Sequence, residues 1–175
     1  MTRKGSIFEN ITIYSGGQTG VDRAALEFAI EAGIPHAGWC PRGRTAEDGV
    51  IPSKFNLRET TSPDPAVRTR LNILDTDAIL IITEGIVESP GTKLTLWFAT
   101  LLNRPVLVID RTESSSEEPS AQRLQKWLFD NPEIQTLNIA GPRASECPEI
   151  GDFSRRIFEL TFQFGQLKSK GPLGV

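Results

Sequence analysis

Apolar residues recur along this chain with two spacings, one typical of buried strands and the other of amphipathic helices. Residues 78–82 give the clearest strand signal, because five consecutive apolar residues without polar alternation are typical of a parallel strand covered on both faces. Residues 19–32 instead show helical spacing, with Ala25 and Phe28 on one face. Gly33 follows directly, where a glycine commonly ends a helix.

Strand-like and helical segments alternate over most of the chain. We expect strands over residues 11–15, 34–39, 78–82, 105–110 and 134–139. We expect helices over residues 19–32, 65–74, 93–103, 121–130 and 150–167. This order predicts an α/β fold, namely a single Rossmann-like, doubly wound, mostly parallel sheet with helices on both faces. The domain is expected to cover residues 1–168, with a mobile C-terminal tail at 169–175, and strands 11–15, 78–83 and 105–109 should be neighbours in one sheet.

A glycine-rich turn joins the first expected strand to the first expected helix. Its three glycines let the backbone take positive φ values and approach a ligand without an intervening Cβ. The first amides of the next helix have no internal acceptors and lie at the positive end of its dipole, which favours an anion. A tight turn without a ligand is the alternative. We expect an anion near Gly16 to Thr19, and the candidate cofactor-binding residues of this stretch are Ser15, Gly16, Gly17, Gln18, Thr19, Gly20 and Asp22.

The glycine pattern differs from two familiar nucleotide sites. Its order is G-G-x-x-G, whereas the dinucleotide fingerprint is G-x-G-x-x-G, and no Gly-Lys-Ser/Thr of a P-loop follows. An acidic residue about 20 positions after a Rossmann turn would bind ribose, but Glu47 and Asp48 come later, in an expected loop. We therefore expect a phosphate-accepting turn and no nicotinamide cofactor.

A second helix N-terminus is expected at the same edge of the sheet. Thr92 is the expected N-cap of helix 93–103, which follows the strongest strand. Gly91, Thr92 and Lys93 would then stand at the carboxyl ends of the strands, where open α/β sheets bind ligands.

A long polar loop at 40–64 is expected to complete the site. Arg42 and Arg44 flank a glycine there, and guanidinium groups match phosphate oxygens. Asp48 of the same loop belongs to the same candidate set. The alternative for each arginine is a solvated position on a charged loop.

Composition narrows the class of protein. The 175 residues suit one domain, and 19 Lys and Arg against 22 Asp and Glu give a net charge of −3. A weakly acidic chain disfavours nucleic-acid binding, which depends on phosphate neutralisation. No apolar run is long enough for a membrane span and no signal peptide opens the chain, so a cytoplasmic protein is expected. Cys40 and Cys147 are expected to be core thiols, and His36, the single histidine, excludes a His-rich metal site.

Several motifs together resemble the molybdenum carrier family. They are the runs from Ser15 to Ala25, Gly38 to Arg44 and Ala46 to Gly49, the pair Arg68-Thr69 with Asn72, and Gly91-Thr92 with Leu94-Thr95. The resemblance covers about residues 11–110. That family is similar to a wider Rossmann-like set that includes the cytokinin-activating phosphoribohydrolases, also called lysine decarboxylase-like proteins, and DNA-processing protein A.

The resemblance implies a homo-oligomer, a dimer or tetramer, that binds molybdenum cofactor, a phosphorylated pterin (molybdopterin) carrying molybdenum on a dithiolene. Such a protein protects the cofactor and passes it to molybdoenzymes or cofactor-biosynthesis proteins. It also implies Gly16 to Thr19 on one side of the pocket and Gly91 and Thr92 on the other, with no catalytic residue and no metal ligand. One departure is Pro90, which stands where the family has a second glycine and removes one amide donor.

Two other classes of function share this fold. A nucleoside-monophosphate phosphoribohydrolase, an N-glycosidase, would need a positioned carboxylate. The candidates are Asp22, Glu47, Asp48 and Glu84, and none lies in the expected motif, where Leu96 and Trp97 stand instead of a glutamate. Single-strand nucleic-acid binding is disfavoured by the acidic balance and by the lack of an aromatic row on which bases could stack.

Overall fold

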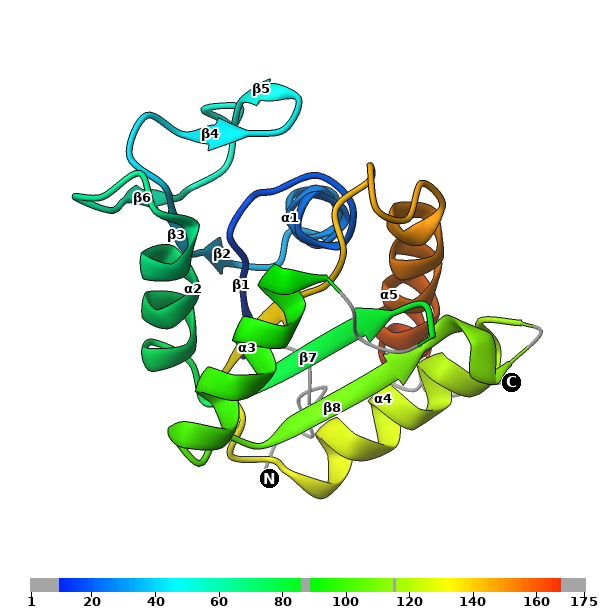
Figure 1. Ribbon diagram of the computed structural model, residues 1–175. Coiled ribbons are helices and arrows are strands. Elements are labelled where there is room, and N and C mark those ends of the chain that lie inside the picture. Colours follow the sequence, from blue (N-terminus) through cyan, green and yellow to red (C-terminus); the bar gives the residue numbers. More distant parts are fainter. Residues whose placement is uncertain (1–9, 86–88, 115, 168–175) are drawn as a thin grey trace, which may run out of the picture.

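The computed structural model describes residues 10–85, 89–114 and 116–167, with side chains up to residue 162 in the last helix. Its centre is a five-stranded sheet in which all neighbouring strands run parallel, in the order β2-β1-β9-β7-β8 (Figure 1). The strands are β1 (Thr12–Tyr14), β2 (His36–Ala37), β7 (Ala78–Thr83), β8 (Val106–Asp110) and β9 (Thr136–Ala140). The predicted α/β, Rossmann-like fold is confirmed, while the expected tail at 169–175 lies outside the described residues.

The last strand of the chain is the central strand of the sheet. β9 lies between β1 and β7, so Asn138 is in register with Tyr14 on one side and Ile79 on the other. Strands β1, β7 and β8 lie in one sheet and β7 and β8 are neighbours as expected, but β9 separates β1 from β7, so the expectation that all three would be neighbours is wrong. If β9 stood first in the chain, the order would read 3-2-1-4-5, which is the start of the usual doubly wound order. The strand order therefore reverses at the border between β9 and β7.

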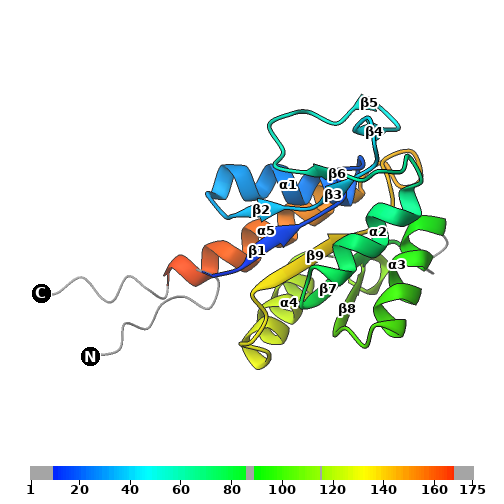
Figure 2. The same cartoon turned by 90° about the vertical axis from the view of Figure 1, so that its left-hand side faces the viewer.

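Helices cover both faces of the sheet (Figures 1 and 2). They are α1 (Val21–Ala32), α2 (Pro65–Leu74), α3 (Pro90–Leu101), α4 (Glu118–Asp130) and α5 (Ile150–Leu167). Helices α1, α4 and α5 pack on one face, and α2 and α3 on the other. Each face of the sheet thus has its own hydrophobic core. In β7, Leu80 and Ile82 belong to the core under α1, α4 and α5, and Ile79 and Ile81 belong to the core under α2 and α3. Burial on both sides explains the unbroken apolar run.

Several expected boundaries differ from the structure, and two of the differences have a clear physical reason. The strand expected over 34–39 is divided into β2 and β3 (Trp39–Cys40) by Gly38, whose φ is 148° and where a Cβ would lie 2.1 Å from the carbonyl oxygen of Ser15. Helix α3 begins at Pro90 with Ser89 as its N-cap, so Thr92 is not the N-cap. Proline suits the first helical position because its φ is already helical and that position needs no amide donor.

The segment expected as a polar loop, 40–64, has more structure than its sequence predicts. β6 (Arg58–Glu59) pairs with β3, and β4 (Thr45–Ala46) forms a hairpin with β5 (Gly49–Val50). Its apolar residues form a separate cluster with one residue of α1, made of Leu26, Cys40, Ile51, Phe55 and Leu57. These residues have no regular spacing, so periodicity could not reveal that they share a small core.

Both cysteines are free and buried, as expected, Cys40 in this loop cluster and Cys147 in the main core. Within the described part of the chain, no helix is long and apolar enough to cross a membrane. Nor do the described His, Cys, Asp and Glu side chains include a group of three or more that could hold a metal ion.

Candidate functional site

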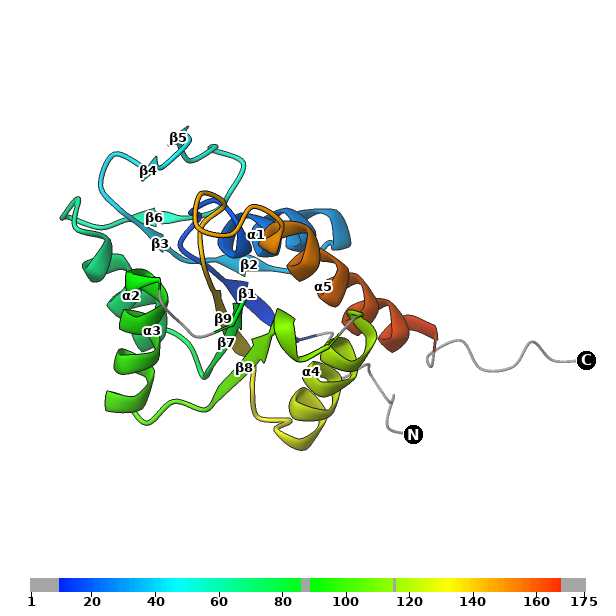
Figure 3. The same ribbon diagram turned by 45° about the vertical axis from the view of Figure 1, so that its right-hand side comes forward.

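Two segments that follow neighbouring strands meet at the carboxyl edge of the sheet. The turn after β1 and the loop after β9 lie side by side (Figure 3), and the amide of Ala144 donates to Thr19 Oγ1 at 3.0 Å. Gly20 allows this approach, because its φ is 76° and a Cβ there would lie 2.4 Å from the carbonyl oxygen of Pro142. Residues far apart in the sequence thus build one wall of the candidate site.

The glycine-rich turn holds a carboxylate of its own. The amide of Gln18 donates to Asp22 Oδ2 at 3.3 Å, and the amide of Thr19 donates to Gln18 Oε1 at 3.0 Å. Asp22 is 3% exposed, and burial raises its pKa although Arg68 and the amides of Gln18 and Gly16 act against that rise. The turn therefore surrounds an anion that comes from α1, and its contact with a ligand stays a prediction.

Arg68 of α2 covers this turn, and the site residues expected from the sequence did not include it. Its Nη1 donates to Asp22 Oδ2 at 3.1 Å. A Cβ at Gly16 would lie 1.8 Å from the same Nη1, so only glycine leaves room for the guanidinium. The one signal in the sequence was the place of Arg68 in the Arg68-Thr69 motif of the family resemblance.

Three buried polar atoms at this edge have no hydrogen-bond partner among the described residues. They are Ser15 Oγ after β1, Arg68 Nε in α2 and Thr92 Oγ1 in the first turn of α3. Ser15 and Thr92 are almost fully buried. Leaving a buried donor or acceptor unpaired costs about 1–3 kcal/mol, and such groups cluster where function requires them. Their gathering at the carboxyl edge makes this edge the candidate ligand site.

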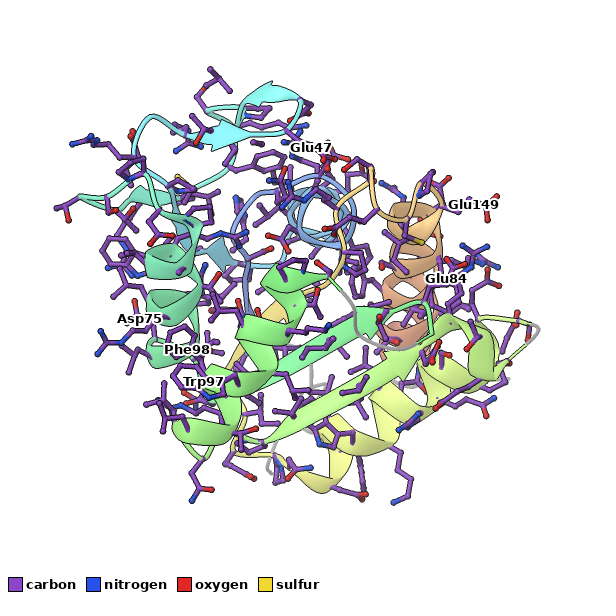
Figure 4. The ribbon with its side chains drawn as sticks, viewed as in Figure 1. Glu47, Asp75, Glu84, Trp97, Phe98 and Glu149 are labelled. Carbon is purple, nitrogen blue, oxygen red and sulfur yellow. The ribbon has the colours of Figure 1, made fainter. Side chains whose placement is uncertain are left out.

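Glu47, at the turn of the β4–β5 hairpin, reaches the glycine-rich turn (Figure 4). Its carboxylate accepts hydrogen bonds from the hydroxyl groups of Thr19 and Ser145 and from the amide of Ser145, the last at 3.1 Å. Burial acts to raise the pKa of Glu47, but the hydrogen bonds from Ser145 and Thr19 outweigh it and the pKa is lowered. An ionised side chain of the protein thus lies against the turn where a ligand anion was expected.

Charged side chains of the loop at 40–64 hold it in place. The Arg44 guanidinium donates at 2.9 to 3.1 Å to four backbone carbonyl groups, those of Ile51, Pro52, Phe55 and Leu57. Asp48 forms two hydrogen bonds of 3.1 Å with Arg23 of α1. Arg44 therefore has an architectural role that the sequence did not predict, and Asp48 attaches the loop to α1. Arg42 is exposed, and ligand contact by any of these residues stays a prediction.

A cavity of about 700 Å³ opens where the strand order reverses. Its walls come from the end of β7, the start of α3 and the loop after β9, namely Thr83, Glu84, Ser89, Pro90, Pro142, Glu146, Cys147 and Pro148. Glu84 Oε2 accepts a hydrogen bond from the Cys147 thiol at 2.6 Å and forms an ion pair of 3.1 Å with Arg111. Burial, followed by the neighbouring Glu84, raises the pKa of the Cys147 thiol, so it is not a reactive thiolate.

The N-terminus of α3 stands at the rim of this cavity. Ser89 is the N-cap and Pro90 the first helical residue, so the first amides that α3 can offer are those of Gly91 and Thr92. Pro90 removes one donor, as expected from the sequence. Gly91 and Lys93 are exposed, and a Cβ built on Gly91 would meet no atom within 4 Å among the described residues beyond its chain neighbours and its own helix backbone. The helix dipole and the Lys93 charge both favour an anion at this point.

Residues 13–162 match the circularly permutated YpsA SLOG family. The chain belongs to this family. Among solved structures, this SLOG chain is similar to a protein from Syntrophus aciditrophicus described as a "putative molybdenum carrier protein". The two share 44% identity with a TM-score of 0.83, over 87% of this chain and 96% of the other. The search among curated proteins found no match.

These similarities confirm the resemblance that the sequence motifs carried. In this SLOG chain the motifs also contact one another, since Arg68 covers Gly16 and Glu47 accepts from Thr19. The central strand that comes last in the chain agrees with a circular permutation of the usual strand order.

Proposed function

We propose that this protein binds, protects and transfers molybdenum cofactor, with the phosphate of the pterin at the N-terminus of α3 and its ring in the adjacent cavity. One observation supports this most directly. The cavity lies at the reversal of strand order between β9 and β7, where doubly wound sheets bind their ligands, and a helix N-terminus stands at its rim. The similarity at 44% identity to a protein described as a molybdenum carrier supports the choice of ligand.

The carboxylates favour a carrier over a glycosidase. Asp22 is paired with Arg68, Glu47 accepts from Thr19 and Ser145, and Asp48 is paired with Arg23, which gives each of them a structural role. Of the four carboxylates that a glycosidase could use, only Glu84 lines the cavity. Hydrolysis of a nucleoside monophosphate is therefore the second candidate, with Glu84 as its acid or base.

The same proposal includes partners. We propose a cytoplasmic homo-oligomer that delivers the cofactor to molybdoenzymes. Trp97 and Leu101 of α3 are 58% and 63% exposed, and large apolar side chains grouped on one helix are typical of an interaction surface.

Transfer of cofactor tests the proposal. Protein purified without oxygen is loaded with molybdenum cofactor, dialysed and mixed with an apo-molybdoenzyme, whose activity reports the cofactor retained. Gly91→Val fills open space at the N-terminus of α3 without backbone strain, and we expect it to weaken retention tenfold or more, about 1.4 kcal/mol. Thr100→Val, at the exposed far end of the same helix, is the matched control. Release of free base from nucleoside monophosphates, with no transfer of cofactor, would contradict the carrier function.

A further inference from the structure

We propose that Glu84 recognises the ring of the ligand, and that its free carboxylate oxygen selects a heterocycle with N–H donors on one edge. The 2-amino-4-oxo edge shared by pterin and guanine has this chemistry. The inference rests on the proposed function for the location of the ligand, and it adds Glu84 as the residue that recognises the ring.

The cavity suits a planar ring. Its volume is about 700 Å³, and three of its lining residues are prolines, Pro90, Pro142 and Pro148. Proline rings give apolar walls without amide donors, against which a flat heterocycle can pack. Ligand sites are typically apolar clefts of about 300–1,000 Å³ with a few placed polar groups. The polar groups of this wall then decide which ring edge fits.

Among the described residues, the wall has two carboxylates, Glu84 and Glu146, and they differ in how many of their oxygens are already paired. Glu84 Oε2 accepts both the Cys147 thiol at 2.6 Å and Arg111 Nη1 at 3.1 Å, whereas Oε1 has no hydrogen bond to any described residue. Both oxygens of Glu146 face Arg143, with Oε2 accepting its amide at 3.1 Å and Oε1 lying 3.6 Å from Nε. Glu84, labelled in Figure 4, is thus held through Oε2 and has Oε1 available.

An oxygen of this kind can only accept hydrogen bonds, because an ionised carboxylate has no donor. Guanine and pterin present an exocyclic amino group and a ring N–H to it. Hypoxanthine lacks the amino group, and xanthine has a carbonyl oxygen there, which would face the carboxylate with a second acceptor. A site built to pair a ligand N–H rejects analogues that lack it. GMP, IMP and XMP are therefore suitable probes, because all three carry the same phosphate and they differ in the group on C2 of the purine ring.

The variant Glu84→Gln gives a sharp test. Arg111 and Cys147 both donate to the Oε2 position, so the amide oxygen must take that place and the NH₂ group must point where Oε1 was. The substitution therefore replaces the acceptor Oε1, which faces the ligand, with an NH₂ donor. In calorimetric titrations we expect the wild-type protein to bind GMP at least tenfold more tightly than IMP or XMP. We expect Glu84→Gln to reverse the order, so that XMP binds more tightly than GMP.

The control is Glu146→Gln, which removes the same charge from the same wall but should keep the preference for GMP, because Glu146 is engaged with Arg143. Melting temperatures confirm that each variant is folded. Equal binding of GMP and IMP by the wild type, no binding of any of the three nucleotides, or an unchanged preference in Glu84→Gln would overturn the inference. Cofactor transfer without preference for GMP overturns the role of Glu84 alone. The reversed preference without cofactor transfer overturns the carrier function alone.

Discussion

Replacing Arg68 with methionine leaves the Asp22 carboxylate buried without its cation. The side chains of Asp22 and Arg68 are 5% and 16% exposed, and Oδ2 lies 3.1 Å from Nη1. Removing one partner of a buried ion pair costs about 3–5 kcal/mol. Methionine keeps much of the apolar stem, so the loss reports mainly on charge. We expect Arg68→Met to lower the free energy of unfolding by about that amount at pH 7, measured by urea denaturation.

The pH dependence of this loss gives an independent check. Burial already raises the pKa of Asp22 above its usual value. A group whose pKa is higher in the folded state contributes stability that is present below the unfolded pKa, about 4, and lost as pH rises through the folded pKa. Removing Arg68 raises the folded pKa further. The destabilisation by Arg68→Met should therefore be smaller near pH 4 than at pH 7.

Asp22→Asn in the Arg68→Met background is the matched control, because it removes the charge that the first substitution exposes. The two changes are in direct contact and should not be additive, so the double variant should recover most of the lost stability. An exposed ion pair contributes at most about 1 kcal/mol. If Arg68→Met lowers the free energy of unfolding by less than that, and the decrease does not vary with pH, the reasoning is refuted.

Three further predictions follow from the same edge of the sheet and from α3. Glu47→Gln should weaken the contact between the β4–β5 hairpin and the turn and speed amide hydrogen exchange in the hairpin; an unchanged rate would contradict this. Gly17→Val should cost about 2–3 kcal/mol in urea denaturation, because φ is 77° and a Cβ would lie 2.8 Å from Leu57; a stable variant would refute the strain. Trp97→Glu should lower the oligomeric state in sedimentation experiments, with Phe129→Glu on α4, an exposed aromatic residue on the opposite face of the sheet, as control; an unchanged mass would exclude this surface.

Much of the fold follows from local patterns. Helices α2 and α5 begin and end where expected, because the first is preceded by an Asp64 N-cap and a proline and the second has regular apolar spacing. The run in β7 predicted burial on both faces, which the two cores confirm. The glycine-rich turn could also be located from the sequence, because positive φ values such as those at Gly17 and Gly20 favour glycine.

Three features were decided only by tertiary structure. β9 is central because strand pairing uses backbone hydrogen bonds, which carry no residue-specific signal about which strands become neighbours. The amides of the glycine-rich turn can donate to any nearby carboxylate, so the sequence could not show that the acceptor would be Asp22, supported by Arg68. The cavity beside Glu84 likewise arises only where β7, α3 and the loop after β9 converge. Sequence alone determined the elements and their glycine-rich turn, whereas long-range packing decided which charges pair with other groups of the protein and which line the cavity.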